Sequence, residues 1–229
     1  MRFPFHSKII LVFGALMLAV STSFANDALY TEAKALQREG KFDEAINVYK
    51  IYLSRPKTDH SLTGKQLAMY TDALVQLMNS FQSQGEPETC ISVLQETFDV
   101  SPVLQNECLR DYYSVMGYAL SRTENMKDAE AATLKALDLP LYHPTPERYF
   151  RDYAYAAAVF YSNPKYQEQV IIWCQEALVQ AKSCMNTSGQ QWVMSMLGSI
   201  YKRTGNLNGA LELFQRSIEE SRSRKDNLG

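Results

Sequence analysis

The sequence predicts an all-α protein in which helical hairpins stack into a solenoid, and three observations support this fold class. Similar patterns of large and small residues recur in five segments, which begin near residues 26, 71, 110, 151 and 191. Within each segment the apolar residues follow helical spacing, and almost no stretch alternates as a strand does. The chain has 229 residues, 46% of them hydrophobic and 21% charged, so it can bury a sizeable core.

Each repeat is expected to contain two helices joined by a turn. The first helices are expected over residues 26–36, 70–81, 109–120, 150–161 and 191–201. The second helices are expected over residues 41–53, 86–98, 126–137, 166–178 and 206–218. Because proline cannot continue a helix, the second helices of three repeats should end near Pro56, Pro102 and Pro140.

Two positions in the first helices show the repeated residue pattern most clearly. The eighth position is small in four repeats and reads Ala33, Met78, Gly117, Ala158 and Gly198. The eleventh is large and apolar in all five and reads Leu36, Phe81, Leu120, Tyr161 and Tyr201. This pattern resembles the tetratricopeptide repeat, a helical hairpin of 34 residues, along nearly all of residues 26–229. The resemblance implies a right-handed α-solenoid whose concave face is lined by the first helices.

The repeats depart from that family in length. Their starts are 39 to 45 residues apart, so each unit carries additional residues, which we expect at the ends of the second helices. Either those helices run longer or the loops between repeats do. No capping helix follows the fifth hairpin, so we expect either that its open edge docks on another surface or that the solenoid continues beyond Gly229.

The N-terminus has the layout of a secretory signal peptide over residues 1–25. Basic residues precede twelve apolar residues from Ile9 to Val20, and small residues then lead to a cleavage site between Ala25 and Asn26. An uncleaved membrane anchor is the alternative, but twelve residues are fewer than the roughly 20 that span a bilayer. We therefore expect an exported protein, periplasmic or secreted, with no membrane insertion after cleavage.

The sequence contains few features of a catalytic, metal-binding or cofactor-binding site. The net charge of −2 gives no reason to expect a nucleic-acid partner, and the three histidines do not stand at metal-ligand spacing. No nucleotide-binding, hydrolase or zinc motif occurs, so we expect no cofactor, no metal and no catalytic residue. Four cysteines follow the leader, Cys90, Cys108, Cys174 and Cys184, and are expected to be mostly structural.

The resemblance implies instead a binding surface. Its groove positions carry the candidate binding residues Lys34, Gln37, Asn79, Gln82, Tyr118, Arg122, Tyr155, Trp192 and Lys202. Three acids occupy equivalent places at the start of first helices, Asp72, Asp111 and Asp152. These acids either face the groove or stabilise the helix dipole.

The leading hypothesis is an exported, non-catalytic scaffold or adaptor that binds a protein or peptide in its concave groove. The alternative is the periplasmic sensory domain of a truncated membrane-bound histidine kinase or transcriptional regulator. An enzyme that acts on exported glycans or peptides is a third hypothesis, without a motif to support it.

Overall fold

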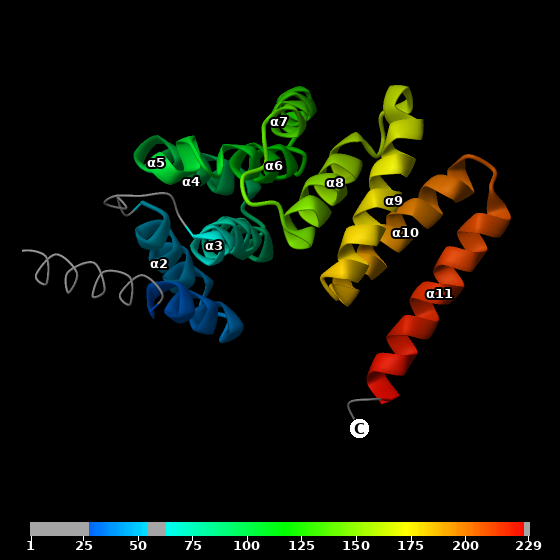
Figure 1. The fold of residues 1–229 in the computed structure, drawn as a ribbon, viewed down its shortest axis with the longest axis horizontal. Helices are drawn as coiled ribbons and strands as arrows, with labels where there is room; N and C mark the ends of the chain where they lie inside the picture. Colours follow the sequence, from blue (N-terminus) through cyan, green and yellow to red (C-terminus); the bar gives the residue numbers. More distant parts are fainter. Residues whose placement is uncertain (1–27, 55–62, 227–229) are drawn as a thin grey trace, which may run out of the picture.

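The structure is a computed structural model that describes residues 28–54 and 63–226. These residues form helices, turns and bends, with no strand among them, so the prediction of an all-α solenoid is confirmed. Figure 1 shows the helices following one another along an arch, from the dark blue helix at residues 28–38 to α11 in red. The proposed leader and the Ala25–Asn26 cleavage site lie outside the described residues.

The helices form antiparallel hairpins in chain order. The first hairpin pairs the helix at 28–38 with α2 (Phe42–Ser54), and the second pairs α3 (Gly64–Gln84) with α4 (Pro87–Val100). A short helix, α5 (Pro102–Gln105), precedes the pair α6 (Leu109–Leu120) and α7 (Met126–Asp138). The fourth hairpin has α8 (Pro146–Phe160), the 3-10 turn η1 (Pro164–Tyr166) and α9 (Gln167–Ser183). The last pairs α10 (Thr187–Arg203) with α11 (Leu207–Asp226).

The additional residues of the repeats lie both before first helices and in longer second helices: α9 reaches Ser183 and α11 reaches Asp226, beyond the expected ends at residues 178 and 218. The second helices α2, α4 and α7 end at Ser54, Val100 and Asp138, close to the three prolines as expected. The first helices α3, α8 and α10 begin several residues before the repeat pattern does, most clearly α3, which starts at Gly64 instead of residue 70, whereas α6 begins at Leu109 as expected. Thr63 accounts for the early start of α3, because its side chain and that of Gln66 form a reciprocal capping box.

Close helix contact explains the small eighth position. A Cβ atom built on Gly117 of α6 would lie 3.0 Å from the backbone nitrogen of Thr133 and 3.1 Å from the carbonyl oxygen of Ala129, both in α7. A Cβ atom on Gly198 of α10 would meet the ring of Phe214 at 2.8 Å. The sequence-derived register of the hairpins α6–α7 and α10–α11 therefore matches the structure.

The core divides into two clusters along the arch. One fills the first three hairpins around Tyr49, Tyr70 and Leu74, and the other fills the last two around Phe160 and Trp173. The partly buried side chains of Leu120 and Trp192 pack against both clusters. The seam between α6 and α8 is thus where the two halves of the solenoid meet.

Three of the four cysteines belong to this core. Cys90, Cys108 and Cys174 are buried, Cys184 is partly buried, and all four are free thiols. Burial raises the pKa of the Cys90 and Cys174 thiols to about 12, so neither forms a reactive thiolate near neutral pH. Their structural role agrees with the expectation from the sequence.

Candidate functional site

Two cavities open beside the first helices. The larger, which we call the α3–α8 cavity, has a volume of about 610 Å³ and is lined by the helix at 28–38, α3, α8 and Asn186. The second, the tyrosine–tryptophan shelf, has a volume of about 450 Å³ and is lined mainly by α6, α8 and α10. Tyr155 lines the α3–α8 cavity and stacks on Tyr118, which lines the shelf, so the two cavities are neighbours.

The shelf is built from three aromatic rings on successive first helices. The rings of Tyr118 and Tyr155 are stacked, with centroids 4.3 Å apart and 7° between their planes. Trp192 meets both edge-on, at 5.9 Å from Tyr118 and 6.2 Å from Tyr155. Such pairs hold each ring in a fixed orientation, and half-buried Trp192 keeps part of its surface open to solvent. Arg122 and Met196 line the same cavity.

Beneath the α3–α8 cavity lies a buried ionic network that joins two repeats. Arg110 of α6 donates to Asp152 of α8 at 2.6 Å, and Arg151 of α8 donates back to Asp111 of α6. Arg148 makes a second, bidentate contact with Asp111, in which its Nε lies 3.0 Å from Oδ1. The exposed fraction of the Asp111 side chain is 0% and that of Arg148 is 3%. The network therefore fixes α6 against α8 in a low-dielectric environment.

This network corrects one expectation. Asp111 and Asp152 do not present carboxylates to a groove, because the structure buries both in contacts with arginines of the adjacent repeat. Burial raises the pKa of Asp152 above its usual value despite the neighbouring arginines. The sequence does hold a signal for the network, since an Arg-Asp pair stands at the same repeat position in residues 110–111 and 151–152.

Polar side chains of the first repeat form hydrogen bonds and an ion pair with the second repeat. Lys34 lies 3.2 Å from Asp72, which also accepts a hydrogen bond from the Tyr30 hydroxyl. Gln37 donates to the carbonyl oxygen of Gln76 at 3.3 Å and accepts from the Tyr49 hydroxyl at 3.2 Å. These contacts join the helix at 28–38 to α3, so Gln37 acts in packing between repeats.

The other candidate residues are distributed unevenly. Tyr118, Tyr155, Trp192 and Arg122 come together at the shelf, and Lys34 lines the α3–α8 cavity. Asn79 and Gln82 are half-buried on α3, Lys202 is exposed on α10, and none of the three lines either cavity. The sequence analysis did not identify Lys65, Arg148 and Arg151, which line the α3–α8 cavity. Lys65 and Arg148 lie in the stretches by which α3 and α8 begin earlier than expected, and Arg151 stands at the first position of its repeat.

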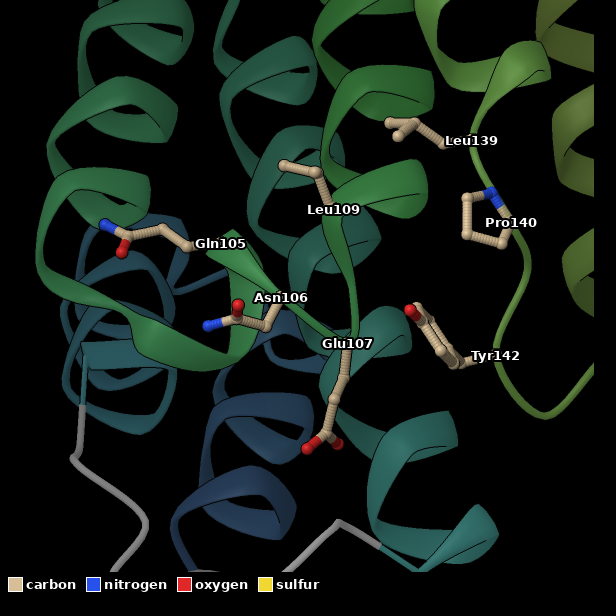
Figure 2. Close-up of a pocket in the computed structure, with 7 residues that line it drawn as sticks. All are labelled: Gln105, Asn106, Glu107, Leu109, Leu139, Pro140 and Tyr142. Carbon is tan, nitrogen blue, oxygen red and sulfur yellow. The ribbon is translucent and has the colours of Figure 1, made fainter.

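A further cavity lies on the connections between repeats. Figure 2 shows its lining, in which Gln105, Asn106, Glu107 and Leu109 face Leu139, Pro140 and Tyr142 across a space of about 360 Å³. Four of its seven lining residues are apolar or aromatic; Leu139, Pro140 and Tyr142 come from the connection after α7, and Leu109 is the first residue of α6. His143 follows Tyr142 in this connection, and His60 lies outside the described residues.

Neither a metal site nor a membrane span is found where the chain is described. Across residues 28–54 and 63–226, no three His, Cys, Asp or Glu residues are grouped so that they could hold a metal ion. Over the same ranges, no helix combines the length and the apolar character needed to cross a bilayer.

Comparison by sequence identifies repeats at both ends of the chain. Models of the tetratricopeptide repeat match residues 27–58 and residues 193–228. These segments contain the first hairpin and most of the last one. No curated protein matches the chain by sequence.

Comparison by structure finds helical repeat proteins of the same kind. BtubC (BKLC) from P. vanneervenii aligns with a TM-score of 0.61 at 14% identity, over 98% of this chain and 93% of that one. MamA from Desulfovibrio magneticus RS-1 aligns with a TM-score of 0.52 at 16% identity, over 86% of this chain and 96% of that one. TPR-like repeats of kinesin light chain type from Podosopora anserina align with a TM-score of 0.55 at 12% identity, over 87% and 96%. At these identities the likeness concerns the fold.

Proposed function

We propose that this chain, a helical solenoid that carries tetratricopeptide repeats, is a non-catalytic scaffold that holds a peptide or protein partner against its first helices. Tetratricopeptide repeats are protein-interaction units, and the extended surface of a stacked-helix solenoid suits an elongated partner. The first helices are rigid, so a partner would meet contacts that are already in place.

The observation that carries the proposal is the tyrosine–tryptophan shelf. Aromatic side chains that are held by their neighbours but keep an open surface are typical anchors of protein interfaces. Trp192 meets this description, because it touches Tyr118 and Tyr155 and remains partly exposed beside a cavity of about 450 Å³. Four serines line the same cavity, Ser121, Ser162, Ser195 and Ser199; the hydroxyls of Ser121 and Ser199 donate to backbone carbonyls nearby in the chain, so towards a peptide backbone these two act as acceptors.

A selection from a random peptide library displayed on phage tests this function. Peptides enriched on the purified protein should lose about 2 kcal/mol of binding free energy, or roughly thirtyfold in affinity, when Trp192→Ala removes the anchor. The matched control is Tyr142→Ala, an exposed aromatic in the cavity of Figure 2. Binding that survives Trp192→Ala and fails with Tyr142→Ala would place the site on the repeat connections and contradict the proposal.

We further propose that the protein is exported and acts outside the cytoplasm, periplasmic or secreted. The support is the three-part layout of residues 1–25 in the sequence. N-terminal sequencing of the protein from its own cells should give Asn26 as the first residue. A species that still begins with Met1 would overturn this part of the proposal.

A further inference from the structure

We infer that a basic amphipathic helix of a partner protein docks in an apolar groove on the second helices, between α4 and α7. This groove, which we call the α4–α7 groove, has a volume of about 400 Å³. Its residues on α6, such as Tyr113 and Met116, and the shelf residues Tyr118 and Arg122 lie on opposite sides of that helix. The inference therefore goes beyond the proposed function, because it assigns a second docking surface to the solenoid.

The groove exists because two second helices flank one first helix. Both α4 and α7 pack against α6, whereas contact between α4 and α7 themselves is slight. The floor is therefore formed by α6, one wall by Ile91 and Phe98 of α4, and the other wall by residues of α7 that include Ala131. Ala131 is small and exposed, so it leaves room beside the α7 wall for larger apolar side chains of a ligand.

Aromatic rings hold the surface of the groove in place. The rings of Phe98 and Tyr112 are stacked, with centroids 4.1 Å apart and 22° between their planes. Tyr113 meets Tyr112 edge-on at a centroid distance of 5.2 Å. Phe98, Tyr113 and Ile91 are only partly buried, so part of their apolar surface is open to a ligand. A preformed surface of this kind accepts aliphatic anchors of a partner.

The polar groups of the groove favour a helix over an extended peptide, because they are already bonded to one another. The Tyr112 hydroxyl donates to Gln95 at 3.1 Å, and the Gln95 amide donates to Asp99 at 2.9 Å. The Lys135 ammonium donates to the Tyr113 hydroxyl at 2.6 Å. An extended peptide would bury backbone groups against apolar walls, whereas a helix satisfies its own backbone. Walls of 14 and 13 residues, about 20 Å long, suit a helix of several turns.

The rim of the groove carries more carboxylates than cations. α4 contains three acids and neither lysine nor arginine, and helical spacing puts Glu88 and Asp99 on the same side as Ile91. Two acids and two lysines of α7 lie in or beside the groove: Lys127, Asp128, Lys135 and Asp138. The Lys135 ammonium lies 4.0 Å from the centroid of the Tyr113 ring, so part of its charge is already engaged. Lysines or arginines beside the apolar stripe of a ligand complement this rim.

Fluorescence anisotropy of three labelled peptides of about 18 residues, measured with the full protein, tests the inference. The first is a helix-forming peptide with a leucine stripe flanked by lysines, and the second has glutamates in place of the lysines. The third has the composition of the first in an order that removes the stripe. The first peptide should bind at least about tenfold more tightly than either of the others. Equal binding of the first and third would overturn the inference, because it would show attraction by charge without a groove.

Substitutions on the walls place the helix in the groove. Ala131→Arg puts a long cationic side chain on the α7 wall and should weaken binding of the first peptide at least about tenfold. The control is Ser92→Arg, which adds the same charge at an exposed position of α4 outside the lining. Unfolding midpoints equal to that of the parent protein show that both variants are folded. An equal loss of binding in both would overturn the inference, since net charge alone would explain it.

A second pair of variants tests the carboxylates of the rim. Asp99→Asn combined with Asp128→Asn should reduce the preference for the lysine peptide over the glutamate peptide about three- to tenfold. The control is Glu212→Gln combined with Glu219→Gln, which removes two exposed carboxylates from α11. A preference that falls equally in the control would contradict a specific role of the α4–α7 rim.

The outcomes distinguish this groove from the shelf. Trp192→Ala should leave binding of the lysine peptide unchanged, because Trp192 belongs to the other surface. Loss of binding in Trp192→Ala would overturn the inference and show that the peptide occupies the tyrosine–tryptophan shelf. If none of the three peptides binds, the inference fails, and the library selection decides the scaffold function separately.

Discussion

At the scale of single residues, this fold depends on positions where two helices leave no room for a side chain. Gly117 and Gly198 occupy the same repeat position but face different neighbours. Gly198 faces the ring of Phe214, a side chain that can shift, whereas Gly117 faces backbone atoms of Thr133 and Ala129. Backbone within a packed helix cannot move aside without separating the hairpin.

Gly117→Ala is therefore expected to destabilise the protein by about 1–3 kcal/mol, the usual range for overpacking. The urea unfolding midpoint, with its slope checked for constancy, measures the change. Gly64→Ala is the control, because a Cβ atom there would meet nothing within 4 Å. A Gly117→Ala midpoint equal to that of Gly64→Ala would show that α6 and α7 do not approach as closely as described.

At the scale of elements, the ends of the first helices decide the shape of the inner face. The repeat pattern sets the middle of α3, but the capping box of Thr63 and Gln66 starts it earlier. At its other end, Gly85 adopts a left-handed conformation with φ of 74°, which ends the helix and turns the chain into α4. The early start brings Lys65 to the α3–α8 cavity.

Thr63→Ala should cost about 1 kcal/mol of stability and fray the first turn of α3, because the amide of Gln66 loses its acceptor. Hydrogen exchange measured peptide by peptide should show faster exchange at residues 64–67 and unchanged exchange in α8. Ser92→Ala, on an exposed face of α4, is the comparison that should leave both regions unchanged. Uniform acceleration along the whole chain would contradict a local role for the cap.

At the scale of the whole molecule, the solenoid is two packed halves joined at one seam. The clusters around Tyr70 and Phe160 share few side chains, and the Arg–Asp network crosses from α6 to α8 where they meet. Repeat arrays unfold as one unit only while the interfaces between neighbours are strong. Removing one partner of a buried ion pair weakens such an interface, because it leaves the other charge unpaired.

Asp111→Asn should therefore cost about 3–5 kcal/mol and separate the unfolding of the two halves. Both tryptophans, Trp173 of α9 and Trp192 of α10, belong to helices of the second half, so their fluorescence reports that half and, through Trp192, its contact with the first, while circular dichroism reports all helices. In the parent protein the fluorescence and circular dichroism signals should change at the same urea concentration, and in Asp111→Asn they should change at different concentrations. Coincident curves in the variant would mean that the network does not couple the halves.

The sequence alone determined the helical hairpins, their number and the register of α6–α7 and α10–α11. Those features follow from the spacing of small and large residues within about forty positions of the chain. It also named the aromatic residues of the shelf, since Tyr118, Tyr155 and Trp192 stand at related positions of successive repeats. Local patterns are sufficient there because neighbouring repeats stack in the same way.

Tertiary structure decided which polar residues remain available to a ligand. Asp111 and Asp152 stand at a groove position by sequence, yet contacts with arginines about forty residues away bury them. Arg148 and Lys65 reach the cavity only because the first helices begin early. Whether a charged side chain forms an ion pair or remains accessible to a ligand depends on the distance between helices of different repeats. The spacing of residues within one repeat does not determine that distance.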